Sequence, residues 1–278
     1  ALYIADLHSW RAAYQAMGML GFVGVAATLL TSEPERYIER DVNRREARVV
    51  AFVEARTHWP QWLRSLGAWF VGAVICPLVD FFARNGRLAL PVLLLVALFK
   101  VSDLSMAAMA QPLYIDLGFS LSEIASITKV FGVAVTIFGG FAGGLLVARY
   151  GIMPMLLAGA ATVAAANLSF AWLAGVGESL PALTVVISAD NFSNGFSATV
   201  FIAWLSSLTS RAYTATQYAL FSSLMTLPGK FIGGFSGKLV EAAGYQWFFI
   251  YAAAIGLPAV LLIVYLMRAG GLRSASSY

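Results

Sequence analysis

Seven stretches of the chain are apolar over about 20 residues or more, and they leave little choice of fold. A helix needs about 20 apolar residues to cross the ~30 Å hydrocarbon core of a membrane. We predict that each stretch is a membrane-spanning helix, and their approximate ranges are 10–31, 88–111, 121–147, 153–174, 181–208, 215–240 and 244–267. A Ser-Leu-Ser-Glu capping box at 120–123 predicts where the third span starts. Only 12% of the 278 residues are charged, whereas soluble domains carry about 25%. The chain is therefore predicted to be an all-α membrane protein, which excludes a soluble enzyme and a nucleic-acid-binding module.

A charged segment separates the first predicted span from the other six. Residues 32–65 mix acidic and basic side chains, as a solvated linker does, and the apolar stretch 66–79 is short and contains Pro77. We interpret 66–79 as an amphipathic helix lying at the membrane interface. One span, a linker and then six spans is the order expected in the middle of a twelve-span transporter made of two six-helix halves. A seven-helix receptor would rarely carry its only long loop after its first helix.

The arginines orient the predicted spans. Thirteen of the fourteen arginines fall on one side of the membrane, and Arg11 is the exception. The positive-inside rule assigns the arginine-rich side to the cytoplasm. We therefore predict a cytoplasmic C-terminus, with Asp116, Glu178 and Glu241 on the opposite side.

The lysines, in contrast, all fall within predicted spans: Lys100, Lys129, Lys230 and Lys238. A charge in the membrane core costs several kcal/mol and usually has a function. At a rise of 1.5 Å per residue, Asp103, Lys129, Asp190 and Lys230 lie about 12–15 Å from the outer ends of their spans, and Lys100 lies slightly deeper. We predict that these five charges form one binding layer. The alternatives are structural ion pairs and lysines that snorkel to the interface, as we expect of Lys238.

The predicted roles follow from the neighbours of each charge. Asp103 has Lys100 one turn away and is expected to pair with it, whereas Asp190 has no such partner on its own helix and is our candidate proton carrier. Three lysines and two aspartates give the layer a net charge of +1, which favours an anionic ligand. The face around Asp190 also holds Asn191 and Asn194, which suit sugar hydroxyls but equally well bind neighbouring helices.

Other motifs point to structure rather than chemistry. Two ridges of glycines favour close helix contacts, with a hinge as the alternative; they are Gly139, Gly140, Gly143 and Gly144, and Gly229, Gly233 and Gly237. The chain has no H-E-x-x-H motif and no phosphate-binding loop ending in Gly-Lys-Ser/Thr. Its single cysteine, Cys76, allows no internal disulfide and no cysteine-based metal site. We expect no enzymatic activity, no cofactor and no bound metal.

Several segments resemble a known family. The sequence GGLLVARYG at 143–151 resembles the G-x-x-x-D-R-x-G loop of the major facilitator superfamily, in which Gly144, Arg149 and Gly151 match and Ala148 replaces the acid. The resemblance makes these three residues a candidate gating loop. Longer segments resemble the AmpG-type muropeptide permeases of that superfamily: FKVSDLSMAAMAQPLYIDLGFSLSEIASITKVFG at 99–132, SADNFSNG at 188–195 and YTATQYALFSSLMTLPGKFIGGFSG at 213–237.

The resemblance implies a bacterial inner-membrane carrier of peptidoglycan recycling and β-lactamase induction. Such a carrier imports anhydromuropeptides, that is, GlcNAc-anhydroMurNAc with or without peptide, by proton symport. It also implies about five spans before this chain. Residues 1–31 would then end an N-terminal bundle, 32–87 would be the cytoplasmic linker, 88–267 the C-terminal six-span bundle and 268–278 a cytoplasmic tail. The alternatives are another permease of the superfamily, for acyl-CoA or drugs, and a membrane sensor that binds its ligand without transporting it.

Overall fold

The structure is a computed structural model that describes residues 9–30, 47–51, 53–210 and 213–269. The chain divides into two units, Ala1–Asn43 and Arg44–Tyr278. The described part of the first unit is α2 (Trp10–Leu30), which matches the first predicted span. Much of the predicted charged linker, and the tail after residue 269, lie outside the described residues.

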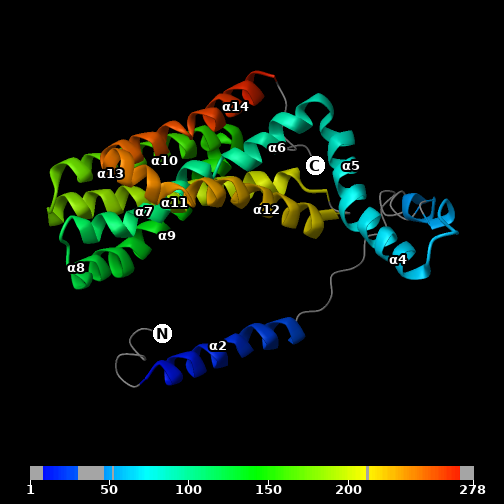
Figure 1. Ribbon diagram of the computed structural model, residues 1–278, viewed down its shortest axis with the longest axis horizontal. Helices are drawn as coiled ribbons and strands as arrows, with labels where there is room; N and C mark the ends of the chain where they lie inside the picture. The colour runs from blue at the N-terminus through cyan, green and yellow to red at the C-terminus, as the bar shows by residue number, and fades with distance from the viewer. Residues whose placement is uncertain (1–8, 31–46, 52, 211–212, 270–278) are drawn as a thin grey trace. The chain divides into compact units, whose positions relative to one another are not determined.

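The second unit is built from helices (Figure 1). Its elements are α4 (Gln61–Phe70), the π-helix η1 (Val71–Ile75), α5 (Cys76–Asn85), the 3₁₀ turn η2 (Gly86–Leu88), α6 (Ala89–Leu98), α7 (Val101–Asp116), α8 (Leu121–Ala125), the π-helix η3 (Ser126–Phe131), α9 (Gly132–Tyr150), α10 (Ile152–Val176), α11 (Leu180–Leu208), α12 (Thr214–Gly233), α13 (Ser236–Ala254) and α14 (Leu257–Arg268). The described residues contain no strand, so the all-α prediction is confirmed.

Most helix ends follow the predicted loops. The capping box is confirmed, because the Ser120 amide donates to Glu123 Oε2 at 2.9 Å and the Glu123 amide donates to Ser120 Oγ at 3.3 Å. The predicted end of a span at residue 111 is wrong, because α7 continues through Pro112 to Asp116. A proline removes one hydrogen bond, and helices in membranes tolerate that loss. The predicted break at 241–244 is a kink within α13 at Gly244, where φ is 80°.

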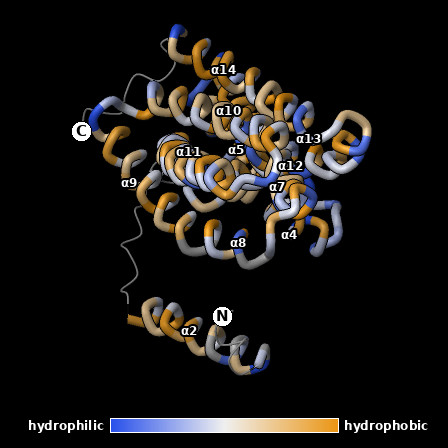
Figure 2. The backbone as a smooth tube through the Cα atoms, turned by 90° about the vertical axis from the view of Figure 1, so that its left-hand side faces the viewer, coloured by the Kyte–Doolittle hydropathy of each residue, from blue (hydrophilic) through white to orange (hydrophobic). Residues whose placement is uncertain are grey.

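Hydropathy separates the described helices into two kinds. Four helical stretches are long and apolar enough to cross a membrane, and they are Gln61–Asp116, Glu123–Tyr150, Ile152–Val176 and Ser236–Arg268. Hydrophobic residues predominate along α9 and α14 (Figure 2). Helices α11 and α12 are not among the four, because polar residues such as Asp190 and Lys230 lie within them. The chain is therefore a multi-pass membrane protein in which two of the predicted spans are unusually polar.

Glycines bring the central helices close together. Helix α11 packs against α9 and α10, and α12 packs against α6 and α7. A Cβ atom added to Gly195 of α11 would overlap the Thr136 carbonyl oxygen, and one added to Gly139 of α9 would overlap that of Phe192. Both predicted glycine ridges supply such contacts, since Gly229 of α12 lies against α7, although Gly237 faces open space.

Two separate apolar clusters form the core of the bundle, with polar side chains between them. Along the segment formed by α6 and α7, the first cluster ends at Phe99 and the second begins at Met106. Along α11 the second cluster ends at Ile187 and the first resumes at Phe192. Buried or half-buried polar and charged residues lie at this level, and we call them the polar layer: Lys100 just before α7, Ser102, Asp103 and Ser105 on α7, Asn167 on α10 and Asp190 on α11.

The predicted interfacial helix lies within a longer helix. Elements α4, η1 and α5 run without interruption from Gln61 to Asn85 and end at Gly86, where φ is 51°. The α4 part exposes large apolar side chains, namely Trp62, Leu66, Trp69 and Phe70. The α5 part instead buries Cys76, Pro77 and Phe81, and in Figure 1 it crosses the end of the bundle beside α12.

Candidate functional site

An ion pair occupies the polar layer where α6 gives way to α7. The regular helix stops at Leu98 and resumes at Val101. Lys100 caps the new helix, and its Nζ donates to Asp103 Oδ2 at 2.8 Å. Lys100 is only 9% exposed, so the pair is shielded from its surroundings. The predicted pairing of Lys100 with Asp103 is confirmed.

Asp190 joins this pair from α11. It is half-buried and close enough to interact electrostatically with both Asp103 and Lys100. Among the described residues, its carboxylate has neither a hydrogen bond nor an ion pair. The trio of Lys100, Asp103 and ionised Asp190 contains one positive and two negative charges, so its net charge is negative. Uptake of a proton by Asp190 would make the trio neutral.

Hydrogen bonds across three helices support the polar layer. Asn167 Nδ2 of α10 donates to Ser102 Oγ of α7 at 2.7 Å, and Ser102 Oγ donates to the Ala252 carbonyl of α13 at 2.6 Å. Two buried atoms, Asn167 Oδ1 and Ser197 Oγ, have no hydrogen-bond partner within the described part of the chain. Sequence reasoning missed Asn167 and Ser102 as parts of the site. Ser102 could have been selected because it lies between Lys100 and Asp103 in the sequence.

The two predicted asparagines differ in their surroundings. Asn191 Nδ2 donates to the Ile187 carbonyl at 2.8 Å, and Asn191 Oδ1 accepts from Thr136 Oγ1 of α9 at 2.9 Å. Asn191 therefore holds α11 against α9. Asn194 is exposed on α11 and makes no hydrogen bond through its side chain within the described residues. Of the two, only Asn194 has its amide free for a ligand.

The remaining lysines lie apart from the ion pair. Lys230 is exposed on α12, and the preceding Gly229 packs against Leu104, which directly follows Asp103. Lys230 thus lies at the height of the ion pair without joining it. Lys129 falls in η3, and its side chain lies outside the described residues.

The predicted gating loop forms the end of α9. Gly151 terminates the helix with a φ of 85°, a conformation that suits glycine. Arg149 is exposed, and its guanidinium lies 5.4 Å from the centre of the Tyr150 ring. Gly144 lies one turn and a half earlier, where its nearest neighbour across the contact is Thr199.

Tyr114 is a further residue that the sequence reasoning did not select. It is buried on α7 and lies within electrostatic range of Asp190. The available signal was its spacing, because it lies eleven positions after Asp103 and eleven residues make slightly more than three helical turns. Tyr114 and Asp103 therefore share one face of α7.

A largely buried ion pair, and a carboxylate that has no ion pair among the described side chains, lie within a bundle of apolar helices and define a multi-pass membrane protein with charged groups in its interior. Comparison with known proteins finds relatives that are named as transporters or permeases. The chain is 31% identical over 270 residues to the putative transporter AmpG 4 of Rickettsia felis, which covers 96% of this chain and 60% of the relative. It is 29% identical over 266 residues to the anhydromuropeptide permease of Escherichia coli (strain K12), which covers 95% of this chain and 48% of the relative.

The resemblance to AmpG-type permeases is thereby confirmed. A second rickettsial relative, the putative transporter AmpG 4 of Rickettsia conorii, is 30% identical over 96% of this chain. No protein-family model matches the chain. The chain spans 48–60% of the length of these relatives. All three relatives are named as transporters or permeases rather than enzymes.

Proposed function

We propose that this chain is the C-terminal part of a proton-coupled carrier that imports anhydromuropeptides. The observation that carries the proposal is Asp190, an intramembrane carboxylate that has no ion pair within the described residues and lies near the Lys100–Asp103 pair. A charged group in such a position is a functional candidate by default, and acidic groups relay protons in many transporters. The substrate class rests on likeness to a relative that is named an anhydromuropeptide permease.

The proposed architecture follows the predicted domains. Residues 1–31 end an N-terminal bundle, 32–87 form a cytoplasmic linker, 88–267 form the C-terminal bundle and 268–278 a cytoplasmic tail. The proposed location is the bacterial inner membrane. The distribution of arginines supports this orientation.

The orientation predicts opposite labelling of two exposed helix ends. In a Cys76→Ser background of the full-length transporter, a membrane-impermeant maleimide added to intact cells should label Asp116→Cys but not Arg149→Cys. Both positions are exposed, at the end of α7 and near the end of α9. Disruption of the cells should make Arg149→Cys reactive as well. Labelling of position 149, but not 116, in intact cells would reverse the proposed topology.

The proposed ligand is an anion. Lys129 and Lys230 are proposed to bind substrate carboxylates, because the ion pair with Asp103 already occupies Lys100. Exposed Asn194 is proposed to bind a sugar hydroxyl. Lys100 and Asn191, the other two predicted contacts, are proposed to line the site while their side chains stay bonded to Asp103 and Thr136. Gly144, Arg149 and Gly151 remain the proposed gating loop.

The lysines give the direct test of the proposal. We expect Lys230→Gln to weaken binding of labelled anhydromuropeptide about tenfold or more, since a hydrogen bond to a charged group contributes about 1.5–3 kcal/mol. Lys129→Gln should act in the same direction. Binding and uptake are measured in vesicles that contain the full-length transporter.

Lys238→Gln is the matched control, because Lys238 is also an exposed lysine of a helix but lies near its end. It should bind like the wild type. Equal binding by the Lys230 and Lys238 variants would remove Lys230 from the site.

The wild type decides between the alternative functions. Binding without accumulation would favour a sensor, and uptake of acyl-CoA or a drug instead would favour another permease.

A further inference from the structure

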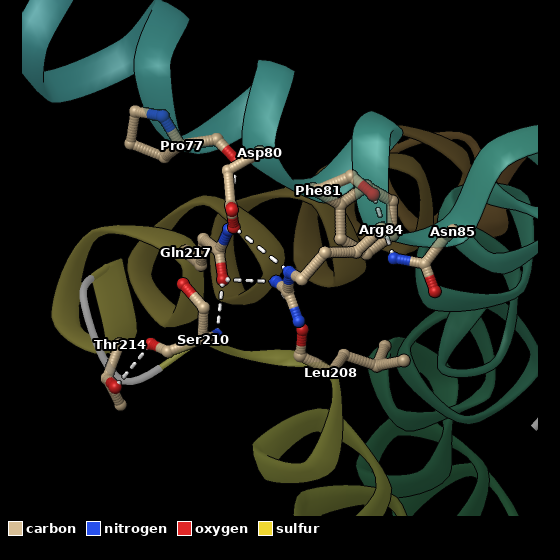
Figure 3. Close-up of polar contacts among 9 residues, drawn as sticks. All are labelled: Pro77, Asp80, Phe81, Arg84, Asn85, Leu208, Ser210, Thr214 and Gln217. Carbon is tan, nitrogen blue, oxygen red and sulfur yellow. Dashed lines mark hydrogen bonds and ion pairs between the residues drawn. The ribbon is translucent and has the colours of Figure 1, made fainter. Parts of the chain in front are cut away.

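A buried glutamine joins α5, which we call the linker helix, to the bundle. Gln217 of α12 is 1% exposed, and its amide makes four hydrogen bonds. Figure 3 shows Gln217 among these partners. Its Nε2 donates to the Pro77 carbonyl at 2.9 Å and to Asp80 Oδ2 at 3.1 Å. Its Oε1 accepts from the Ser210 amide at 2.8 Å and from Arg84 Nη2 at 3.2 Å. Two donors and two lone pairs are all that the amide offers, so its hydrogen-bonding capacity is fully used.

The two charged partners of Gln217 also bind each other. Arg84 Nε donates to Asp80 Oδ2 at 3.0 Å, within α5. Arg84 Nη2 also donates to the carbonyl of Leu208, the last residue of α11, at 3.2 Å. We call Asp80, Arg84 and Gln217 the latch. The latch joins α5 to the end of α11 and the start of α12.

Helix α12 extends from the latch to the polar layer. Gly229 lies against Leu104 so closely that an added Cβ would be 2.7 Å from the Leu104 Cβ. Ser105 Oγ donates to the Gly229 carbonyl at 3.5 Å. Leu104 and Ser105 directly follow Asp103 of the ion pair. A single helix therefore contacts the linker helix at one end and the charged segment of α7 at the other.

We propose that Gln217 is a positioning residue that makes α5 and α12 move together during transport. The latch fixes the linker helix to α12, and α12 in turn sets the position of α7 at the ion pair. Packing of apolar side chains alone would allow α5 to slide, whereas four directed hydrogen bonds specify one arrangement. The role of the latch in transport rests on the proposed function. The latch itself can be tested without any substrate.

The native cysteine reports whether α5 is docked. Cys76 is fully buried and directly precedes Pro77, a partner of Gln217. In membranes containing the full-length protein, N-ethylmaleimide should label Cys76 slowly in the wild type. Gln217→Ala and Arg84→Ala should each raise the labelling rate about tenfold, because losing buried hydrogen bonds favours local opening.

Two exposed residues provide matched controls, Gln111 at the far end of α7 and Arg87 three residues after Arg84. Gln111→Ala and Arg87→Ala should label at the wild-type rate. Wild-type labelling rates in both latch variants would overturn the proposal.

A cross-link distinguishes positioning from a general loss of structure. In a Cys76→Ser background, Asp80→Cys with Gln217→Cys removes the latch, and uptake of labelled anhydromuropeptide should slow about tenfold with an unchanged half-saturation concentration. A short bifunctional thiol reagent that joins positions 80 and 217 should restore the rate. If the cross-link blocks uptake instead, α5 and α12 separate during transport and the proposal is wrong. If the wild type shows no uptake at all, the proposed function fails, while the labelling of Cys76 still decides the latch.

Discussion

Replacing Asp190 by asparagine in the proposed full-length transporter is expected to abolish accumulation driven by a pH gradient, while ligand binding and counterflow exchange remain. Asparagine has nearly the shape of a protonated aspartate but cannot release a proton. The trio of Lys100, Asp103 and residue 190 would therefore be fixed in its neutral state. Coupling requires a group that changes its protonation during the cycle, whereas exchange of bound for free ligand does not.

The matched control is Asp116→Asn. Asp116 is an exposed aspartate that accepts a hydrogen bond from Tyr245 Oη at 2.6 Å, far from the polar layer. Uptake by vesicles with and without a pH gradient should be normal in this variant. If Asp190→Asn keeps pH-driven accumulation, the assignment is wrong, and Asp103 becomes the candidate for the proton-carrying group.

Alanine at Gly195 or at Gly139 is expected to prevent stable assembly of the bundle. In both cases the new methyl group would overlap a backbone carbonyl of the facing helix, Thr136 or Phe192. A backbone atom cannot turn away as a side chain can, so α9 and α11 would have to separate. Overpacking usually costs about 1–3 kcal/mol, and we expect at least the upper end of that range here. Thermal unfolding in detergent, together with the amount of folded protein in membranes, measures the effect.

Two other glycines should tolerate alanine. A methyl group added to Gly144, also on α9, would have Thr199 Cγ2 as its nearest neighbour, at 3.9 Å, and one added to Gly237 of α13 would meet nothing within 4 Å. Gly144→Ala and Gly237→Ala should be neutral or slightly stabilising, since alanine is the better helix former. Equal stability of Gly195→Ala and Gly144→Ala would show that the α9–α11 contact is looser than described.

Sequence reasoning predicted the helices and the charged pair well, because both depend on local spacing. Apolar runs longer than a bilayer is thick, and a lysine three residues from an aspartate, constrain the structure without knowledge of other helices. The capping box at Ser120 and Glu123 succeeded for the same reason. Pro112 led to the wrong prediction that a span ends at residue 111, because α7 continues through the proline to Asp116.

What the sequence did not predict depends on contacts between distant segments. Asn167, Ser102 and Gln217 look like ordinary polar residues until the partners are known, and those partners lie 65 to 150 residues away. For Lys230, the sequence predicted the depth of the residue along its helix but not the direction in which its side chain points. Its exposed position on α12 depends on how that helix packs against α7.

The interruptions of α6–α7 and α13–α14 meet at the polar layer. The first lies at Phe99–Lys100 and the second at Ile255–Gly256, and a Cβ added to Gly256 would lie 3.3 Å from the Ser102 Cβ. The regular pattern is disturbed at both points, because Lys100 has a φ of −93° and a ψ of 0° and the Gly256 amide donates to the Ala253 carbonyl, only three residues back. A change of angle there therefore costs less than elsewhere along the helices. Above and below, stacked rings stiffen each apolar cluster, such as Phe99 with Phe201 and Phe170 with Phe249. We therefore expect these helices to bend between the two apolar clusters, at the level of the charges.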